Sequence, residues 1–148
     1  VGNKQGHHLN VLLTDTDSHQ DWAEHLPRLL EPQGVRAIRA RSVGEAVEAI
    51  DREPIHAAVV NLDLPMSGSD SEEGGLKLLR VIQRLQPTPP SVVIRGRRFD
   101  RRVDDRMLSE ALKLKAFSVL DLPVKLEQVL EVLRRILQRH YGGHWPNR

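Results

Sequence analysis

Acidic and amide side chains follow two apolar runs of this chain, at the positions where a buried strand would end. Asp15 and Asp17 come shortly after the first run. Asn61 and Asp63 come after another. Carboxylate and amide oxygens are hard donors that suit Mg²⁺, and a carboxylate can also act as a nucleophile. A cation site or a carboxylate nucleophile is therefore the first chemistry to consider.

Two further apolar runs end in groups of opposite charge. Arg95 follows the run 92–94, and Asp121–Pro123 follows the run 117–120. In an open sheet of parallel strands, a site forms outside the carboxyl ends of the strands. We therefore expect all of these polar residues to face one edge of a sheet.

A cluster of arginines is the most unusual local feature of the sequence. It could bind an acidic partner or phosphate groups. It could equally form ion pairs with the acidic residues of segment 64–75, or keep one surface hydrated. The arginine cluster comprises Arg95, Arg97, Arg98, Arg101, Arg102 and Arg106.

The elements that would position these residues alternate regularly along the chain. Short apolar runs of strand type interleave with stretches whose apolar residues recur at helical spacing. Such alternation predicts a parallel sheet covered by helices on both faces. Segment 64–75, rich in Gly, Ser and acids, is predicted as a loop. The predicted strands are 11–13, 35–40, 57–60, 92–94 and 117–120, and the predicted helices are 22–30, 45–50, 76–85, 107–114 and 126–137.

Composition fits one ordinary globular domain. The chain has 148 residues, of which 39% are hydrophobic and 28% charged, and its formal net charge is +2. The low net charge argues against general affinity for nucleic acid, and the absence of cysteine fits a reducing, cytoplasmic location. We expect a flexible leader at 1–8, a domain at 9–139, a tail at 140–148, and no membrane-spanning segment.

Three motifs resemble those of the receiver domains of bacterial response regulators. The run 11–17 is similar to the hydrophobic strand that ends in an acidic pair in that family. Segment 61–65 is similar to the motif around the phosphorylated Asp, and segment 116–123 to the motif that ends in Lys-Pro. The resemblance covers roughly residues 9–138. It implies a flavodoxin-like (βα)5 three-layer sandwich whose parallel five-stranded sheet has the strand order 2-1-3-4-5.

The sequence departs from the family at the positions that carry its chemistry. The resemblance places Asn61 at the phosphorylated Asp, and Thr16 at the second acid of the pair led by Asp15. It also places Arg95 at the switch Ser or Thr, and Leu122 at the Lys. Lys115 stands at the Gly of the last motif. An amide is a poor nucleophile, so we expect a degenerate site without catalytic residues or cofactor.

Two alternatives concern the remaining carboxylates. Asp63, two residues beyond Asn61, could act as a displaced phosphoryl acceptor, although we favour a loop carboxylate. Asp15 and Asp17 could hold Mg²⁺ weakly together with Asn61. We prefer an interpretation in which Asp15 hydrogen-bonds nearby backbone and Asp17 caps the first helix. A further hypothesis has Arg95 neutralise Asp15 and lock one conformation.

The function that we expect is phosphorylation-independent signalling by protein–protein contact. Within a two-component-type system, the partner would be a signalling kinase, an output domain or a second copy of the chain. The resemblance places the contact on the face formed by helix 107–114, strand 117–120 and helix 126–137. The arginines 97, 98, 101, 102 and 106 would take part in it. Anion or nucleic-acid binding by the arginine cluster is the third alternative, and an enzyme is not expected.

Overall fold

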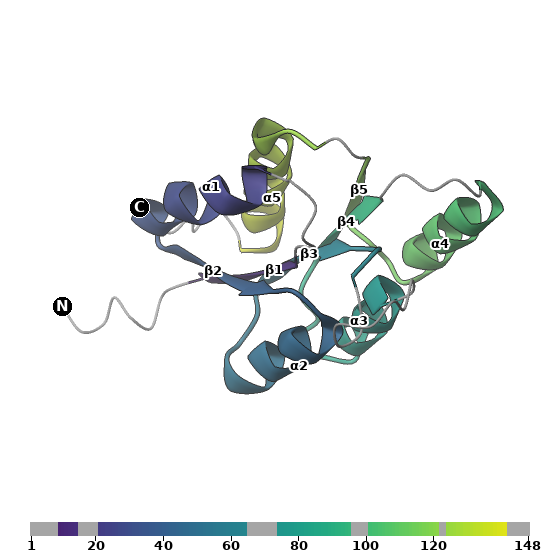
Figure 1. Cartoon of the computed structure of the whole chain (residues 1–148). Helices are drawn as coiled ribbons and strands as arrows, with labels where there is room; N and C mark the ends of the chain where they lie inside the picture. The colour runs from purple at the N-terminus through teal and green to yellow at the C-terminus, as the bar shows by residue number, and fades with distance from the viewer. Residues whose placement is uncertain (1–8, 15–20, 65–73, 96–100, 122–123, 142–148) are drawn as a thin grey trace.

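The computed structural model describes residues 9–14, 21–64, 74–95, 101–121 and 124–141 (Figure 1). They form five parallel strands in the order β2-β1-β3-β4-β5. The predicted flavodoxin-like architecture is therefore confirmed. The strands are β1 (Leu9–Thr14), β2 (Val35–Ala40), β3 (Ala57–Asn61), β4 (Ser91–Arg95) and β5 (Ser118–Asp121).

Helices cover both faces of the sheet. Figure 1 shows α1 and α5 on one face and α2, α3 and α4 on the other. A short 3-10 turn, η2 (Glu31–Gln33), follows α1 and ends at Gly34, whose φ is 81°. The helices are α1 (Asp21–Leu30), α2 (Val43–Arg52), α3 (Gly74–Gln83), α4 (Arg101–Lys113) and α5 (Leu126–His140).

The core consists of two clusters separated by the sheet. Successive strand residues point to opposite faces, so Val11 and Leu13 pack with the side chains of α5, whereas Leu12 packs with those of α2 and α3. The central strands β1 and β3 are buried along almost their whole length, which explains why their sequences are continuous apolar runs. This rigid sheet fixes where each strand end lies.

Several element ends differ from the sequence-based prediction by one to three residues, and α4 begins six residues earlier than predicted, at Arg101. Helix α3 begins at Gly74, so the predicted loop 64–75 extends two residues too far. Helix α5 continues to His140, and Tyr141 then packs against the α5-side core cluster. Among the described helices, none combines the length and the apolar run needed to cross a membrane.

Candidate functional site

The carboxyl ends of three neighbouring strands bring together polar residues that are far apart in the sequence. Asn61 is the last residue of β3, Arg95 of β4 and Asp121 of β5. In the sheet register Asn61 lies beside Ile94, and Arg95 lies beside Asp121. We refer to this end of the sheet as the carboxyl edge.

Thr14 joins β1 to β3 immediately below Asn61. Its hydroxyl donates a hydrogen bond to the carbonyl of Val59 and accepts one from the backbone N–H of Asn61, both at 2.8 Å. Thr14 is fully buried, and Asn61 is 2% exposed. The hydroxyl is the hydrogen-bond partner of two buried backbone groups, the carbonyl of Val59 and the N–H of Asn61. It thereby fixes the position of Asn61 relative to β1.

The Asn61 side chain stabilises the turn that follows β3. Its Oδ1 accepts a hydrogen bond from the backbone N–H of Asp63 at 2.8 Å. The backbone carbonyl of Asn61 accepts a second one from the N–H of Leu64 at 3.0 Å. This is the local pattern that makes Asn favourable in turns. The amide thus has a structural role, and it supplies neither a charge nor a nucleophile.

Helix α3 starts directly against this turn. A Cβ placed on Gly75 would lie 2.5 Å from the carbonyl oxygen of Asn61 and 2.5 Å from the Cα of Leu62. A Cβ on Gly74 would lie 1.9 Å from the carbonyl oxygen of Leu64. Both glycines are therefore required by close backbone packing beside Asn61.

Arg95 and Asp121 form an ion pair across β4 and β5. The Arg95 Nε donates to Asp121 Oδ1 at 2.7 Å, with the side chains 26% and 63% exposed. Arg95 also makes a contact besides this one. The hypothesis that Arg95 neutralises Asp15 concerns a residue outside the described ranges and stays a prediction.

The structure describes some of the remaining predicted site residues, and others lie outside the described ranges. Asp63 is half-buried in the turn after β3, and Arg106 is an exposed residue of α4; both make further contacts. Arg101 and Arg102 begin α4, but their side chains are not described. The residues outside the described ranges are Asp15, Thr16, Asp17, Arg97, Arg98 and Leu122.

The described residues do not fit a tightly held Mg²⁺. Mg²⁺ prefers carboxylate oxygens and a near-octahedral shell. At the carboxyl edge, Asn61 offers a neutral oxygen that already accepts a hydrogen bond from Asp63. Within the described ranges, no group of three or more His, Cys, Asp and Glu side chains could hold a metal ion.

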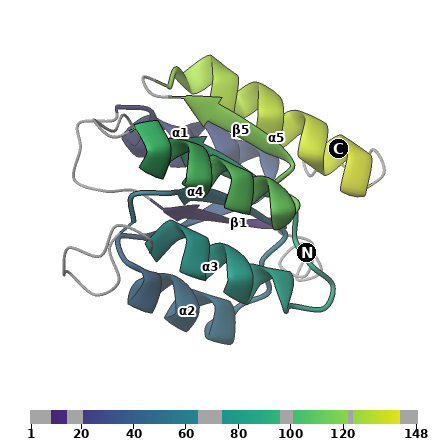
Figure 2. The same cartoon turned by 90° about the vertical axis from the view of Figure 1, so that its right-hand side faces the viewer.

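The face formed by α4, β5 and α5 is the predicted partner contact, and α4 carries an exposed leucine, Leu112. Figure 2 views this side of the molecule, with α4 in front of the sheet and β5 beside it. β5 is an edge strand whose residues are half-buried or exposed. Leu112 of α4 is 55% exposed, and Leu29 of α1, at 42%, is the other exposed large hydrophobic residue among those described. Single exposed leucines are common on protein surfaces, so Leu112 alone does not mark a contact.

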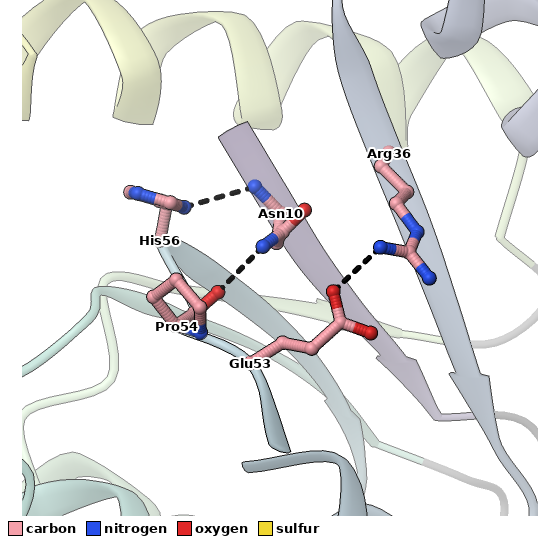
Figure 3. A network of polar contacts seen from close by, with 5 residues as sticks. All are labelled: Asn10, Arg36, Glu53, Pro54 and His56. Atoms are coloured by element: carbon pink, nitrogen blue, oxygen red, sulfur yellow. Dashed lines mark hydrogen bonds and ion pairs between the residues drawn. The ribbon is translucent and has the colours of Figure 1, made fainter. Parts of the chain in front are cut away.

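A second polar network lies at the opposite, amino-terminal edge of the sheet (Figure 3). The backbone N–H of Asn10 donates to His56 Nδ1 at 2.9 Å, and Asn10 Nδ2 donates to the carbonyl of Pro54 at 2.8 Å. The Tyr141 hydroxyl donates to the carbonyl of His56 at 2.6 Å, and the two rings meet edge to face. Desolvation by burial lowers the pKa of His56 and raises the pKa of Tyr141.

Sequence reasoning missed this network and the role of Thr14. Asn10 and His56 are 46 residues apart, and each by itself resembles an ordinary surface residue. The one available signal was the polar residue within the apolar run of β1, since an Asn in a buried strand must find hydrogen-bond partners. The hydroxyl of Thr14 at the end of that run offered the same signal.

Comparison with known proteins identifies the fold. No protein-family model matches the sequence, and no curated protein matches it. A CheY-like response regulator receiver domain protein from Methanospirillum hungatei JF-1 has a TM-score of 0.70 and 20% identity, over 92% of this chain and 99% of that chain. A response regulator from Thermotoga maritima has a TM-score of 0.65 and 23% identity, over 88% of this chain and 98% of that one.

A longer protein, NtrX from Brucella abortus, matches with a TM-score of 0.69 and 22% identity over 90% of this chain. The match covers 28% of NtrX, so the chain spans little more than a quarter of that protein. At these identities the likeness concerns the fold. The chain therefore has the receiver fold of CheY-like response regulators.

Proposed function

We propose that this chain is a receiver-like signalling module that acts by binding a protein partner and does not depend on aspartyl phosphorylation. It is a binding module rather than an enzyme. The face formed by α4, β5 and α5 contacts the partner, which is a kinase, an output domain or a second copy of the chain. The observation that carries the proposal is the buried Asn61 at the carboxyl end of β3.

Asn61 supports the proposal through its chemistry and its contacts. Aspartyl phosphorylation needs a carboxylate that attacks phosphorus, and an amide has no such nucleophile. The Oδ1 of Asn61 is engaged with the N–H of Asp63, which makes the residue a turn stabiliser. Phosphoryl transfer also needs cations that neutralise the developing charge, and the described donors do not suit Mg²⁺.

The pair of Arg95 and Asp121 supports the absence of a switch. A switch needs a group whose interactions differ between two states. At the end of β4, where receivers carry a small hydroxyl residue, this chain has a long cation held by Asp121 at 2.7 Å. The pair joins β4 to β5, and a guanidinium at this position offers no hydroxyl for contact with a phosphoryl group, which supports signalling without phosphorylation.

The test is the intact mass of the protein after incubation with acetyl phosphate and Mg²⁺. We expect no gain of a phosphoryl group in the native chain. An Asn61→Asp variant, treated in parallel, measures whether a carboxylate alone restores acceptance. A phosphoryl group on the native chain that hydroxylamine removes would overturn the proposal.

The same experiment decides the alternative acceptor. Asp63 is half-buried and follows Asn61 in the turn, so it is the carboxylate of the described carboxyl edge nearest to that position in sequence. If Asp63 accepted the phosphoryl group, an Asp63→Asn variant would lose the mass gain. Anion or nucleic-acid binding by the arginine cluster is tested separately, because binding through phosphates weakens steeply with salt.

A further inference from the structure

The amino-terminal edge of the sheet, opposite Asn61, gathers the carboxyl ends of α3, α4 and α5. These ends lie together on the right-hand side of Figure 2. The Gln83 Nε2 of α3 donates to the carbonyl of Leu114 at 2.5 Å, directly after α4. The rings of Phe117, before β5, and His140, at the end of α5, are 5.8 Å apart. The three helix ends therefore form one continuous surface.

This surface concentrates positive charge. Its exposed basic residues face one acid, Glu110, whose carboxylate oxygens are 3.8 Å from Arg80 Nη2 and from Lys113 Nζ. The surface thus carries a net +4, whereas the whole chain carries +2, so the remainder of the chain is net negative. We name it the basic edge; it comprises the five cations Arg80, Arg84, Lys113, Lys115 and Arg139 and the one acid Glu110.

Three of these cations have no acidic partner among the described residues: Arg84, Lys115 and Arg139. Basic residues near helix ends do interact favourably with the helix dipoles. That interaction is confined to the last turn, and Lys115 lies beyond the end of α4. Dipole compensation alone therefore does not account for the whole surface.

Lys115 is held in a conformation that disfavours it. Its φ is 65°, in the left-handed region where glycine is the usual residue. Its N–H donates to the carbonyl of Leu112 at 3.0 Å, and Ala116 N–H donates to the carbonyl of Ala111 at 3.3 Å. This pair of bonds is the Schellman motif, which normally ends on glycine. A lysine at such a strained position points to a role for its side chain.

We propose that the basic edge binds an acidic segment of a protein partner, and that Lys115 contacts its carboxylates. The cations are exposed and arranged over three helix ends, so they can face a run of Asp and Glu side chains. Single-stranded nucleic acid is less suited, because its bases stack on exposed aromatic side chains and the Phe117 ring is half-buried against His140. That the partner is a protein rests on the proposed function, whereas the charge and the strained lysine do not.

The test uses a fluorescein-labelled hexaglutamate peptide as the probe and hexaglutamine as its uncharged control. Binding is measured by fluorescence anisotropy at low salt, and the contacted residues are mapped by ¹⁵N NMR. We expect backbone shifts at Lys113, Lys115 and Arg139. A Lys115→Gly variant should bind hexaglutamate on the order of threefold to tenfold more weakly, through the loss of one cation.

The same variant should be more stable than the native chain. Glycine relieves the left-handed strain, so the midpoint of thermal unfolding should rise by about 2–6 °C. We expect Lys115→Gly to raise stability and to weaken binding together. If Lys115 had only a structural role, the substitution would not weaken binding. The matched control is Lys77→Ala, which removes an exposed lysine of α3 outside the basic edge and should leave binding unchanged.

Several outcomes would overturn the inference. One is unchanged hexaglutamate affinity in Lys115→Gly, or an equal loss in Lys77→Ala. Another is NMR shifts confined to the arginine cluster. Binding of a single-stranded oligonucleotide or of phosphatidylserine vesicles, without binding of hexaglutamate, would assign the surface to a different class of partner. None of these outcomes involves acyl phosphate, so the failure of this inference is distinguishable from that of the proposed function.

Discussion

A single imidazole links the starts of β1 and β3 to the end of α5. His56 Nδ1 accepts the backbone N–H of Asn10 at 2.9 Å, which requires a lone pair on that nitrogen. Protonation of Nδ1 would place two N–H groups against each other. Since Tyr141 donates to the carbonyl of the same residue, disturbing His56 should also loosen the anchor of α5.

We therefore predict that stability falls as the pH drops below the ordinary histidine range. The ordinary pKa of a histidine is 6.5, and burial lowers the pKa of His56 below this value in the folded chain. The unfolded chain therefore takes up the proton first as the pH falls. The stabilisation is fully present above about pH 6.5 and is lost as the pH falls towards the folded pKa. The measurement is the free energy of unfolding in urea, from about pH 8 to about pH 5.

The control for this prediction is a His56→Gln variant, whose side chain does not titrate. Carboxylates contribute the same pH dependence to both chains, so the difference between the two curves isolates His56. We expect the native curve to fall more steeply in that range. Parallel curves would show that protonation of His56 does not oppose folding.

At this scale the sequence predicted the identity of the candidate residues better than their contacts. The departure of Asn61 from the receiver pattern was visible in the sequence, and the structure places Asn61 at the end of β3. The bond from its N–H to Thr14 joins residues 47 positions apart, and sequence spacing gives no signal for such a pair. The hypothesis for Arg95 named Asp15 as its partner, whereas the ion pair with Asp121 depends on the register of β4 and β5, which the sequence does not give.

Elements were predictable because their signals are local. The apolar runs of the central strands and the helical spacing between them predicted all five strands and the five helices named here. The start of α3 was predicted wrongly, because Gly74 and Gly75 have low helix propensity and resemble loop residues. Their presence follows from the approach of the α3 backbone to Leu64 and Asn61, which is a tertiary constraint.

This constraint gives a prediction for α3. A Gly75→Ala substitution places a Cβ 2.5 Å from the carbonyl of Asn61, so the helix start must shift. We expect a loss of about 1–3 kcal/mol in the free energy of unfolding, as for other overpacked sites. Chemical denaturation measures it, with Gly44→Ala as control, because Gly44 is exposed in α2. Equal effects of the two substitutions would contradict the close-packing argument.

The two proposed sites lie at opposite ends of the strands. The carboxyl edge holds Asn61 and the pair of Arg95 and Asp121, and the basic edge lies at the opposite end of the strands. The face of α4, β5 and α5 connects the two ends. The fixed platform that we propose would bring partners together without changing conformation, because binding requires complementary surfaces rather than a population shift.

The last prediction concerns self-association through that face. Leu112 is 55% exposed on α4, and burying a leucine in an interface contributes about 1.5–3 kcal/mol. We expect the native chain to form a dimer in sedimentation velocity at high concentration, and Leu112→Asp to weaken the dimer on the order of tenfold or more. Stability should change little, since Leu112 is mostly solvated in the monomer.

Leu29→Asp is the matched control, because Leu29 is 42% exposed but lies on α1, on the other face of the sheet. If Leu29→Asp disrupted the dimer and Leu112→Asp did not, the contact would belong to α1. A native chain that stays monomeric at every concentration would exclude self-association.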